Sequence, residues 1–126
     1  MGFEQEYSSK LTTAEEAVKG VKSGTIVDWG FFNGKPVVLD EALARRHAEL
    51  TDVSVYTAVS IPPIPKVCEH PESFIYHDWQ WSKVTRIIRS VGPVYYSPIL
   101  YHQAPDYYRN KIAPHRHTAM IRVGSM

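Results

Sequence analysis

The sequence has few of the features that mark secreted, membrane-bound or nucleic-acid-binding proteins. Among its 126 residues there is one cysteine, Cys68, so no internal disulfide can form, and the N-terminus lacks the apolar segment of a signal peptide. No apolar run approaches the roughly 20 residues needed to cross a bilayer. The 14 Lys and Arg residues nearly balance the 13 Asp and Glu residues, which leaves no strong positive field to attract phosphates. We therefore expect a cytoplasmic protein with no membrane and no nucleic-acid partner.

The common motifs of nucleotide binding, serine hydrolysis and zinc binding are also missing. The glycine-containing residues 30–34 match neither G-x-G-x-x-G nor G-x-x-x-x-G-K-[ST], and no G-x-S-x-G elbow occurs. The motifs Cys68-Glu69-His70 and His115-Arg116-His117 do not have the spacing of a structural zinc site. The sequence therefore predicts no metal ion and no tightly bound cofactor.

The segment from Thr25 to Arg46 is the most informative stretch of the chain. An apolar run ends at Trp29, an Asn33-Gly34 pair marks a tight turn, and helical spacing follows Pro36. Asn-Gly between apolar runs also fits a β-hairpin, but the proline would remove a donor from the returning strand, and strong helix formers follow it. We favour a strand, a loop and a helix whose N-terminus points main-chain N–H groups at an anionic or carbonyl-bearing ligand.

The rest of the chain shows alternating strand and helix patterns. A capping-box pattern at Thr12 and Thr13 predicts a first helix that ends at Gly24. Further strands are expected at residues 53–60, 73–77, 94–96 and 118–123, and further helices at residues 81–91 and 105–109. Strands separated by helical segments predict an open, mostly parallel α/β sheet with crossover helices, in a single domain of residues 1–126.

In such a sheet, ligands bind outside the carboxyl ends of the strands. Four loops are expected at that edge and are predicted to line one cleft: residues 30–34, 61–65, 97–101 and 124–126. Residues 77–81 could place a polar group beside an aromatic wall, although buried aromatic packing is the favoured interpretation for them.

Several of these segments resemble a known enzyme family. The matching residues are 11–19, 27–36, 39–44, 96–98 and 107–109, of which the G-F-x-N-G-x-P stretch is the most specific. They are similar to the N-terminal region of the acetyl-CoA hydrolase/transferase family, in particular to its butyryl-CoA:acetate and 4-hydroxybutyrate CoA-transferases. The resemblance runs from about Tyr7 to Val123 and departs near the end, where His117-Thr118 replaces a Val-Asp-type pair and residues 124–126 replace Ser-Pro-Met-Asp.

The resemblance implies a two-domain α/β enzyme that moves coenzyme A between short-chain carboxylic acids, with an acyl-CoA thioester and a carboxylate as substrates. In that family a glutamate carboxylate attacks the thioester, and this glutamate belongs to the C-terminal domain, as does most of the CoA-binding surface. None of the candidates corresponds to it: Glu41, Glu49, Glu69 and Glu72. No catalytic residue is therefore assigned, and we expect a truncated N-terminal domain that has no turnover alone.

The same resemblance predicts which residues face the acyl and carboxylate pocket between the domains: Gly30, Phe31, Asn33, Gly34 and Pro36. Main-chain N–H groups at this loop would suit the negative charge that develops on a thioester oxygen. An exposed sheet edge is expected to need a partner, either the missing C-terminal domain or a second copy in a homo-oligomer. Two alternatives stay open: a non-enzymatic module that binds a small acid or acyl group, and a structural or assembly subunit.

Overall fold

Five parallel strands form one sheet, in the order β4-β3-β2-β1-β5. The computed structural model describes residues 2–112 and 117–124. Its strands are β1 Ile26–Trp29, β2 Val53–Thr57, β3 Phe74–Asp78, β4 Val94–Tyr96 and β5 His117–Met120. The prediction of an open parallel α/β sheet is confirmed, although the second and fifth strands are shorter than expected. Residues 115 and 116 of the His-Arg-His motif, and residues 125 and 126 of the last expected loop, lie outside the described part of the chain.

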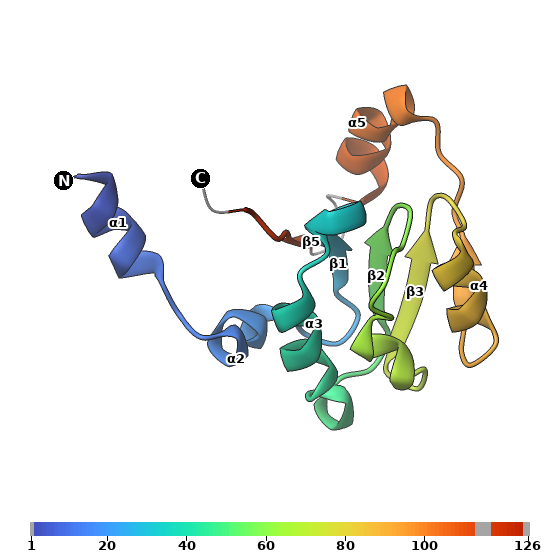
Figure 1. Cartoon of the computed structure of the whole chain (residues 1–126), viewed down its shortest axis with the longest axis horizontal. Coiled ribbons are helices and arrows are strands. Elements are labelled where there is room, and N and C mark those ends of the chain that lie inside the picture. Colours follow the sequence, from blue (N-terminus) through green and yellow to red (C-terminus); the bar gives the residue numbers. More distant parts are fainter. Residues whose placement is uncertain (1, 113–116, 125–126) are drawn as a thin grey trace.

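Helices fill the connections between the strands (Figure 1). The α-helices are α1 Phe3–Lys10, α2 Ala14–Ala17, α3 Val37–Ala44, α4 Lys83–Arg89 and α5 Ala104–Tyr107. Short 3-10 helices are η1 Val18–Gly20, η2 Phe32–Gly34, η3 His47–Glu49, η4 Lys66–Glu69 and η5 Tyr101–Gln103, and α5 continues into the π-helix η6 Tyr108–Ile112. No helix in the described part of the chain is long and apolar enough to span a membrane.

The helix starts follow the capping signals of the sequence. The side chain of Thr13 accepts a hydrogen bond from the N–H of Glu16 at 3.2 Å, as the capping pattern predicts. Ser82 and Thr85 form a reciprocal capping box at the start of α4. Helix α1 has no counterpart in the prediction, because it buries none of its residues and its sequence therefore carries no core-facing stripe. Figure 1 shows this helix standing apart from the sheet.

The connection between β1 and β2 decides between the two interpretations of the Asn33-Gly34 pair. β1 pairs with β2 in parallel, with Val27 opposite Val55, and α3 lies in the connection. A hairpin would have made the two strands antiparallel, so the strand, loop and helix interpretation is confirmed. The Asn-Gly pair belongs to the 3-10 turn η2.

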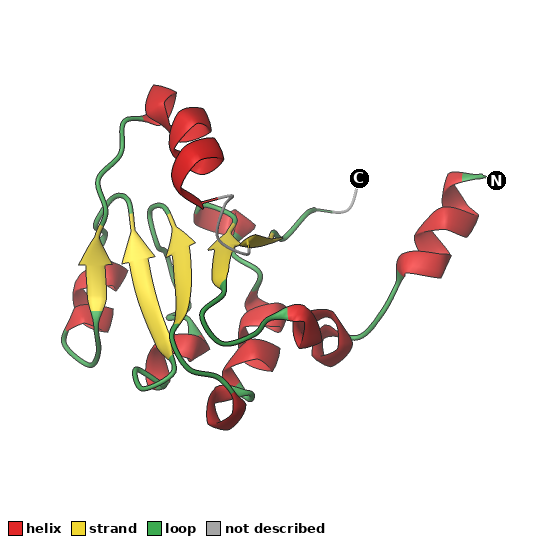
Figure 2. Cartoon of the chain, turned by 180° about the vertical axis from the view of Figure 1, so that it is seen from behind, coloured by secondary structure: helices red, strands yellow, loops and turns green. Residues whose placement is uncertain are grey.

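The two faces of the sheet differ in their cover. Helices α3 and α4 lie on the same face (Figures 1 and 2). The core includes the buried side chains of Val27, Trp29 and Ile88. On the opposite face, α5 and η6 cover only the carboxyl-end region, so most of that face is bare in Figure 2. The order of the strands also makes the chain cross from β4 at one edge to β5 at the other. The carboxyl ends of β1 and β5 therefore form the topological switch point where ligands collect in α/β folds.

Candidate functional site

The loop after β1 lies at this switch point and is bound to the segment after β5. The N–H of Gly30 donates to the Met120 carbonyl at 3.0 Å, and the N–H of Arg122 donates to the Gly34 carbonyl at 2.8 Å. A Cβ atom on Gly30 would overlap the Gly34 carbonyl oxygen and would lie 2.7 Å from Cγ1 of Ile121. Only glycine fits at this position, which explains the first glycine of the G-F-x-N-G-x-P stretch.

Several main-chain N–H groups of this loop donate hydrogen bonds within the protein. The N–H of Gly34 donates to the Phe31 carbonyl at 2.7 Å, that of Lys35 to Phe32 at 3.4 Å, and that of Val37 to Lys35 at 3.1 Å. These three N–H groups are therefore engaged within the protein, and the tip of the loop is one remaining source of donors for a ligand. At that tip Phe32 has a left-handed backbone, with φ of 50°, a strained conformation of the kind that clusters at functional sites.

A cavity of about 410 Å³, called the Phe31 cavity below, opens beside the loop, and its volume is within the size range of small-molecule sites. Its lining residues are Asp28, Phe31, Trp79, Tyr101, Ala104, Pro105 and Tyr108. The ring of Trp79 lies 5.1 Å from that of Phe31 and 5.8 Å from that of Tyr108, measured between centroids. The walls are thus mainly aromatic and apolar, which favours an alkyl or acyl group over a strongly polar ligand.

One acidic side chain, Asp28, contributes to this lining, and its Oδ1 atom is buried. Burial, together with the charge and hydrogen bond of Asp28, raises the pKa of Tyr108 well above its usual value. Tyr108 therefore keeps its proton at neutral pH and can donate to the carboxylate. This pairing fixes the start of η6 against the end of β1.

The five residues predicted to face the acyl pocket occupy different positions. Phe31 lines the cavity, and Asn33 is exposed at the tip of the loop. Gly30 and Gly34 lie behind the tip against Ile121. Pro36 is buried and borders a shallow hollow on the side of Arg122. Of the five, Phe31 is therefore the one that borders the cavity directly among the described residues.

The loop at residues 61–65 was expected in the same cleft but contributes none of the described lining residues. It is instead fixed to the loop after β1 through Lys35, whose Nζ donates to the carbonyls of Ile61, at 2.7 Å, and Pro63. Lys35 is 5% exposed, and burial lowers the pKa of its ammonium group. Sequence spacing could not show this contact, because it joins segments 26 and 28 residues apart.

The end of the 61–65 loop is held by a buried carboxylate of α3. Asp40 accepts hydrogen bonds from the N–H groups of Lys66, at 2.7 Å, and Val67, at 3.1 Å. Burial raises the pKa of Asp40 to about 6, and the two N–H donors oppose the shift. Lys35, just before α3, and Asp40, within it, therefore hold the start and the end of the 61–65 loop.

A second buried carboxylate, Asp78, holds the wall of the cavity in place. Its oxygens accept hydrogen bonds from Ser60 Oγ at 2.7 Å, from Thr85 Oγ1 at 2.6 Å and from the N–H of Val59 at 2.9 Å. These hydrogen bonds join the ends of β2 and β3 to α4. The next residue after Asp78 is Trp79, which is 5% exposed. The expected buried aromatic packing of residues 77–81 is confirmed for this tryptophan, whereas Trp81 is 37% exposed.

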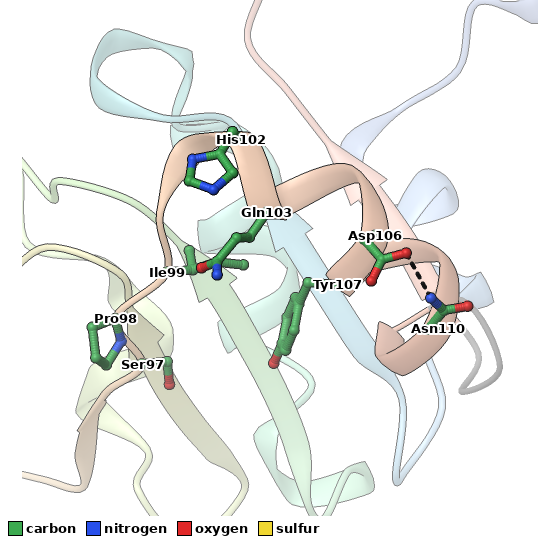
Figure 3. Close-up of a pocket in the computed structure, with 8 residues that line it drawn as sticks. All are labelled: Ser97, Pro98, Ile99, His102, Gln103, Asp106, Tyr107 and Asn110. Atoms are coloured by element: carbon green, nitrogen blue, oxygen red, sulfur yellow. Dashed lines mark hydrogen bonds between the residues drawn. The ribbon is translucent and has the colours of Figure 1, made fainter.

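A larger hollow, of about 920 Å³, lies between α5 and the loop that follows β4 (Figure 3). Its lining residues are Ser97, Pro98, Ile99, His102, Gln103, Asp106, Tyr107 and Asn110, most of which are exposed. The side-chain amide of Asn110 donates a hydrogen bond to Asp106 at 2.8 Å. Figure 3 shows Tyr107 pointing from α5 toward the sheet. Its walls are mostly solvated surface, and it lies beside the bare sheet face.

The bare face carries a row of stacked rings next to this hollow. His77 of β3 stacks on Tyr56 of β2, with centroids 4.2 Å apart, and lies 5.3 Å from Tyr95 of β4. Burial lowers the pKa of His77 to about 4, so the ring is neutral at pH 7. Burial, reinforced by Tyr107, raises the pKa of Tyr56 to about 12. The row is thus an uncharged aromatic surface at neutral pH.

Fold and site together define a parallel α/β domain with a mainly aromatic cavity beside the loop that follows β1. Comparison with known families gives a direct assignment. The acetyl-CoA hydrolase/transferase N-terminal domain family matches residues 1–118, and the chain belongs to this family.

Similar proteins of known sequence are CoA-transferases by name. The chain is 38% identical over 128 residues to the butyryl-CoA:acetate CoA-transferase of Anaerostipes caccae. It is 32% identical over 124 residues to the probable butyrate:acetyl-CoA coenzyme A-transferase of Syntrophomonas wolfei. These alignments cover 100% and 97% of this chain, which spans 28% and 27% of the length of the two relatives.

Solved structures show the same fold. RipA from Yersinia pestis is 28% identical, with a TM-score of 0.78 over 96% of this chain and 30% of its own. A 4-hydroxybutyrate CoA-transferase from Porphyromonas gingivalis is 21% identical, with a TM-score of 0.64 over 98% of this chain and 27% of its own, a likeness of fold alone.

Proposed function

We propose that this chain is the N-terminal part of a cytoplasmic CoA-transferase that exchanges coenzyme A between short-chain acids such as acetate, butyrate and 4-hydroxybutyrate. In this proposal the 410 Å³ cavity holds the acyl group of the acyl-CoA or carboxylate substrate. The observation that carries the proposal is that an aromatic cavity, rather than a basic one, lies at the switch point beside Phe31.

The composition of the walls sets the orientation of the ligand. Asp28 would repel a carboxylate that approached it closely, so the carboxylate or thioester end is expected at the tip of the loop, near Asn33. The alkyl end would then lie among Phe31, Trp79 and Tyr101. Each buried CH₂ group contributes about 0.8 kcal/mol, so butyrate should bind roughly 15-fold more tightly than acetate.

The nucleophilic glutamate is proposed to lie in the part of the relatives that this chain does not span. Two facts support this. Among the described residues that line the cavity, the one acidic side chain is Asp28, whose Oδ1 atom is buried. The glutamates of α3, η3 and η4 and of the turn before β3 do not contribute to the lining. The same missing part, or a second copy, is proposed to cover the bare sheet face.

Two neighbouring phenylalanines provide a matched test of the cavity. Phe31 lines it, whereas Phe32 is 52% exposed. We expect ligand-observed NMR titrations to show binding of butyrate to the wild-type chain and to Phe32→Ala. Phe31→Ala should bind butyrate about tenfold or more weakly, because it loses most of one wall. Equal affinity in the two variants would contradict the assignment of the cavity.

The loop tip and the absence of a nucleophile need separate measurements. Asn33→Ala should weaken acetate and butyrate by a similar factor, since it removes a donor for the carboxylate rather than a contact with the alkyl chain. A transfer assay with butyryl-CoA and acetate should give no turnover with this chain alone. Robust turnover would refute the proposal that the glutamate lies elsewhere.

A further inference from the structure

Three side chains that can coordinate metals meet at the edge of the sheet opposite the Phe31 cavity. His47 is the first residue of η3, His70 directly follows η4, and Glu72 lies in the turn that leads into β3. One potential ligand atom from each lies within 4.8 Å of the other two. This edge carries the amino ends of the strands, so the cluster is separate from the site proposed for acyl transfer.

The distances within the cluster match those around a bound zinc ion. Oε1 of Glu72 lies 3.3 Å from Nδ1 of His47 and 3.4 Å from Nδ1 of His70. Tetrahedral zinc with bonds of about 2.0 to 2.2 Å places neighbouring ligand atoms roughly 3.3 to 3.5 Å apart. Two of the three ligand-to-ligand separations are therefore compatible with one coordinated ion, as they are with imidazole–carboxylate hydrogen bonds, and the titration below distinguishes the two.

The two imidazole rings are stacked, with centroids 3.8 Å apart and planes at 10°. Their Nδ1 atoms face the same carboxylate, and binding one metal ion through both would require the rings to tilt out of this stack, because the lone pairs of parallel rings do not converge. The side chains of His47 and His70 are 40% and 27% exposed, and that of Glu72 is 60% exposed. This exposure leaves room for the tilt, and for water molecules at the remaining coordination positions.

The main chain around the cluster is fixed by a buried serine. Ser73 is 3% exposed, and its Oγ donates to the His47 carbonyl at 2.7 Å. The N–H groups of Ser73 and Phe74 both donate to the His70 carbonyl, each at 3.0 Å. The two histidines are thus held on one hydrogen-bonded frame although they are far apart in the sequence. Such a frame lowers the ordering cost of binding a ligand between them.

We propose that His47, His70 and Glu72 form a binding site for a divalent transition-metal ion, with zinc as the best fit. Two imidazoles and one carboxylate are ligands that zinc takes in proteins, and the open positions would be filled by water. The bound ion would join η3 to the turn before β3, which makes the site a structural clamp rather than a part of acyl transfer.

The test is a titration of the chain with zinc chloride, followed by calorimetry and thermal unfolding. We expect one zinc ion per chain and a Tm that rises by about 5 to 10 °C at free zinc near 100 times the Kd. His70→Ala should weaken zinc binding by more than the roughly 10- to 100-fold that loss of a ligand's supporting hydrogen bond costs. Glu72→Gln changes an exposed side chain and should also weaken binding while the chain stays folded.

Two control variants separate this site from other histidines. His102→Ala changes an exposed histidine of η5 and should leave zinc binding unchanged. The double variant His115→Ala/His117→Ala removes the other closely spaced pair and should also bind one zinc ion as the wild-type chain does. The proposal is overturned if the wild-type chain binds no zinc, if His70→Ala and Glu72→Gln bind it normally, or if the double variant abolishes binding.

Discussion

Replacing Gly30 with alanine should displace the loop that forms one wall of the Phe31 cavity. The added methyl group would overlap the carbonyl oxygen of Gly34 and lie 2.8 Å from its carbonyl carbon, and 2.7 Å from Cγ1 of Ile121. The carbonyl cannot turn away freely, because it accepts the hydrogen bond from the N–H of Arg122 at 2.8 Å. The clash therefore involves main chain on one side and a branched side chain on the other.

The size of the effect follows from these contacts. Overpacking a well-packed region costs about 1 to 3 kcal/mol, and the loss of the Arg122 hydrogen bond costs about 1 kcal/mol more. A destabilisation of about 3 kcal/mol is therefore expected for Gly30→Ala. In a chain of this length, that corresponds to a fall in Tm of roughly 10 °C.

Urea unfolding and thermal unfolding would measure the change, with Gly20→Ala as the matched control. A Cβ atom on Gly20 meets no atom within 4 Å, and its backbone is not left-handed. That variant should stay within about 0.5 kcal/mol of the wild-type chain or gain slightly in stability. Gly30→Ala should in addition lose butyrate binding. If the two variants unfold within 1 kcal/mol of one another, the close packing of residues 30 and 34 against Ile121 is refuted.

Two further predictions concern the buried charges around the 61–65 loop. Burial raises the pKa of Asp40 from 3.8 to about 6, so the folded state holds the carboxyl proton more tightly than the unfolded chain does. The stabilisation that this proton gives is complete below pH 4 and is lost as the pH rises through 6. Urea unfolding between pH 4 and 7 should therefore show the free energy of unfolding of the wild-type chain falling by roughly 2 kcal/mol relative to that of Asp40→Asn, and parallel pH curves would contradict the assignment. Lys35→Met leaves the carbonyls of Ile61 and Pro63 without their donor and should cost about 2 kcal/mol. It should also speed tryptic cleavage after Lys66, at the end of this loop, whereas Lys22→Met, at an exposed position, should change neither.

The sheet and the loop after β1 could be predicted because their signals are local. The strand of Val27 and Trp29, the turn at Asn33-Gly34 and the helix formers after Pro36 lie within about twenty consecutive residues. Two local features decided between a hairpin and a crossover: Pro36 has no N–H group to donate to a returning strand, and the residues after it favour a helix. The capping residue Thr13 acts in the same local way.

The rest depended on contacts between distant segments, which periodicity does not encode. Lys35 follows the loop as an ordinary surface-type residue in the sequence, yet it is buried and bonded to the 61–65 loop. His47, His70 and Glu72 match no metal spacing because two separate turns bring them together. Helix α1 was not predicted for a different reason. It buries none of its residues, so its sequence has no stripe of apolar residues at helical spacing.

Residues of α5 line both the 920 Å³ hollow and the Phe31 cavity. Tyr107 of α5 interacts with Tyr56 on the bare face, whereas Tyr108 interacts with Asp28 at the cavity, so adjacent residues fix the same short helix on both sides. A protein segment that filled the 920 Å³ hollow would lie beside the neutral row around His77 but would also bury the carboxylate of Asp106, so it would have to supply a hydrogen-bond donor or a positive charge to that carboxylate. The same segment would contact α5, whose Ala104 and Pro105 line the Phe31 cavity. Under the proposed function, a segment bound in this hollow would therefore change the shape of the Phe31 cavity.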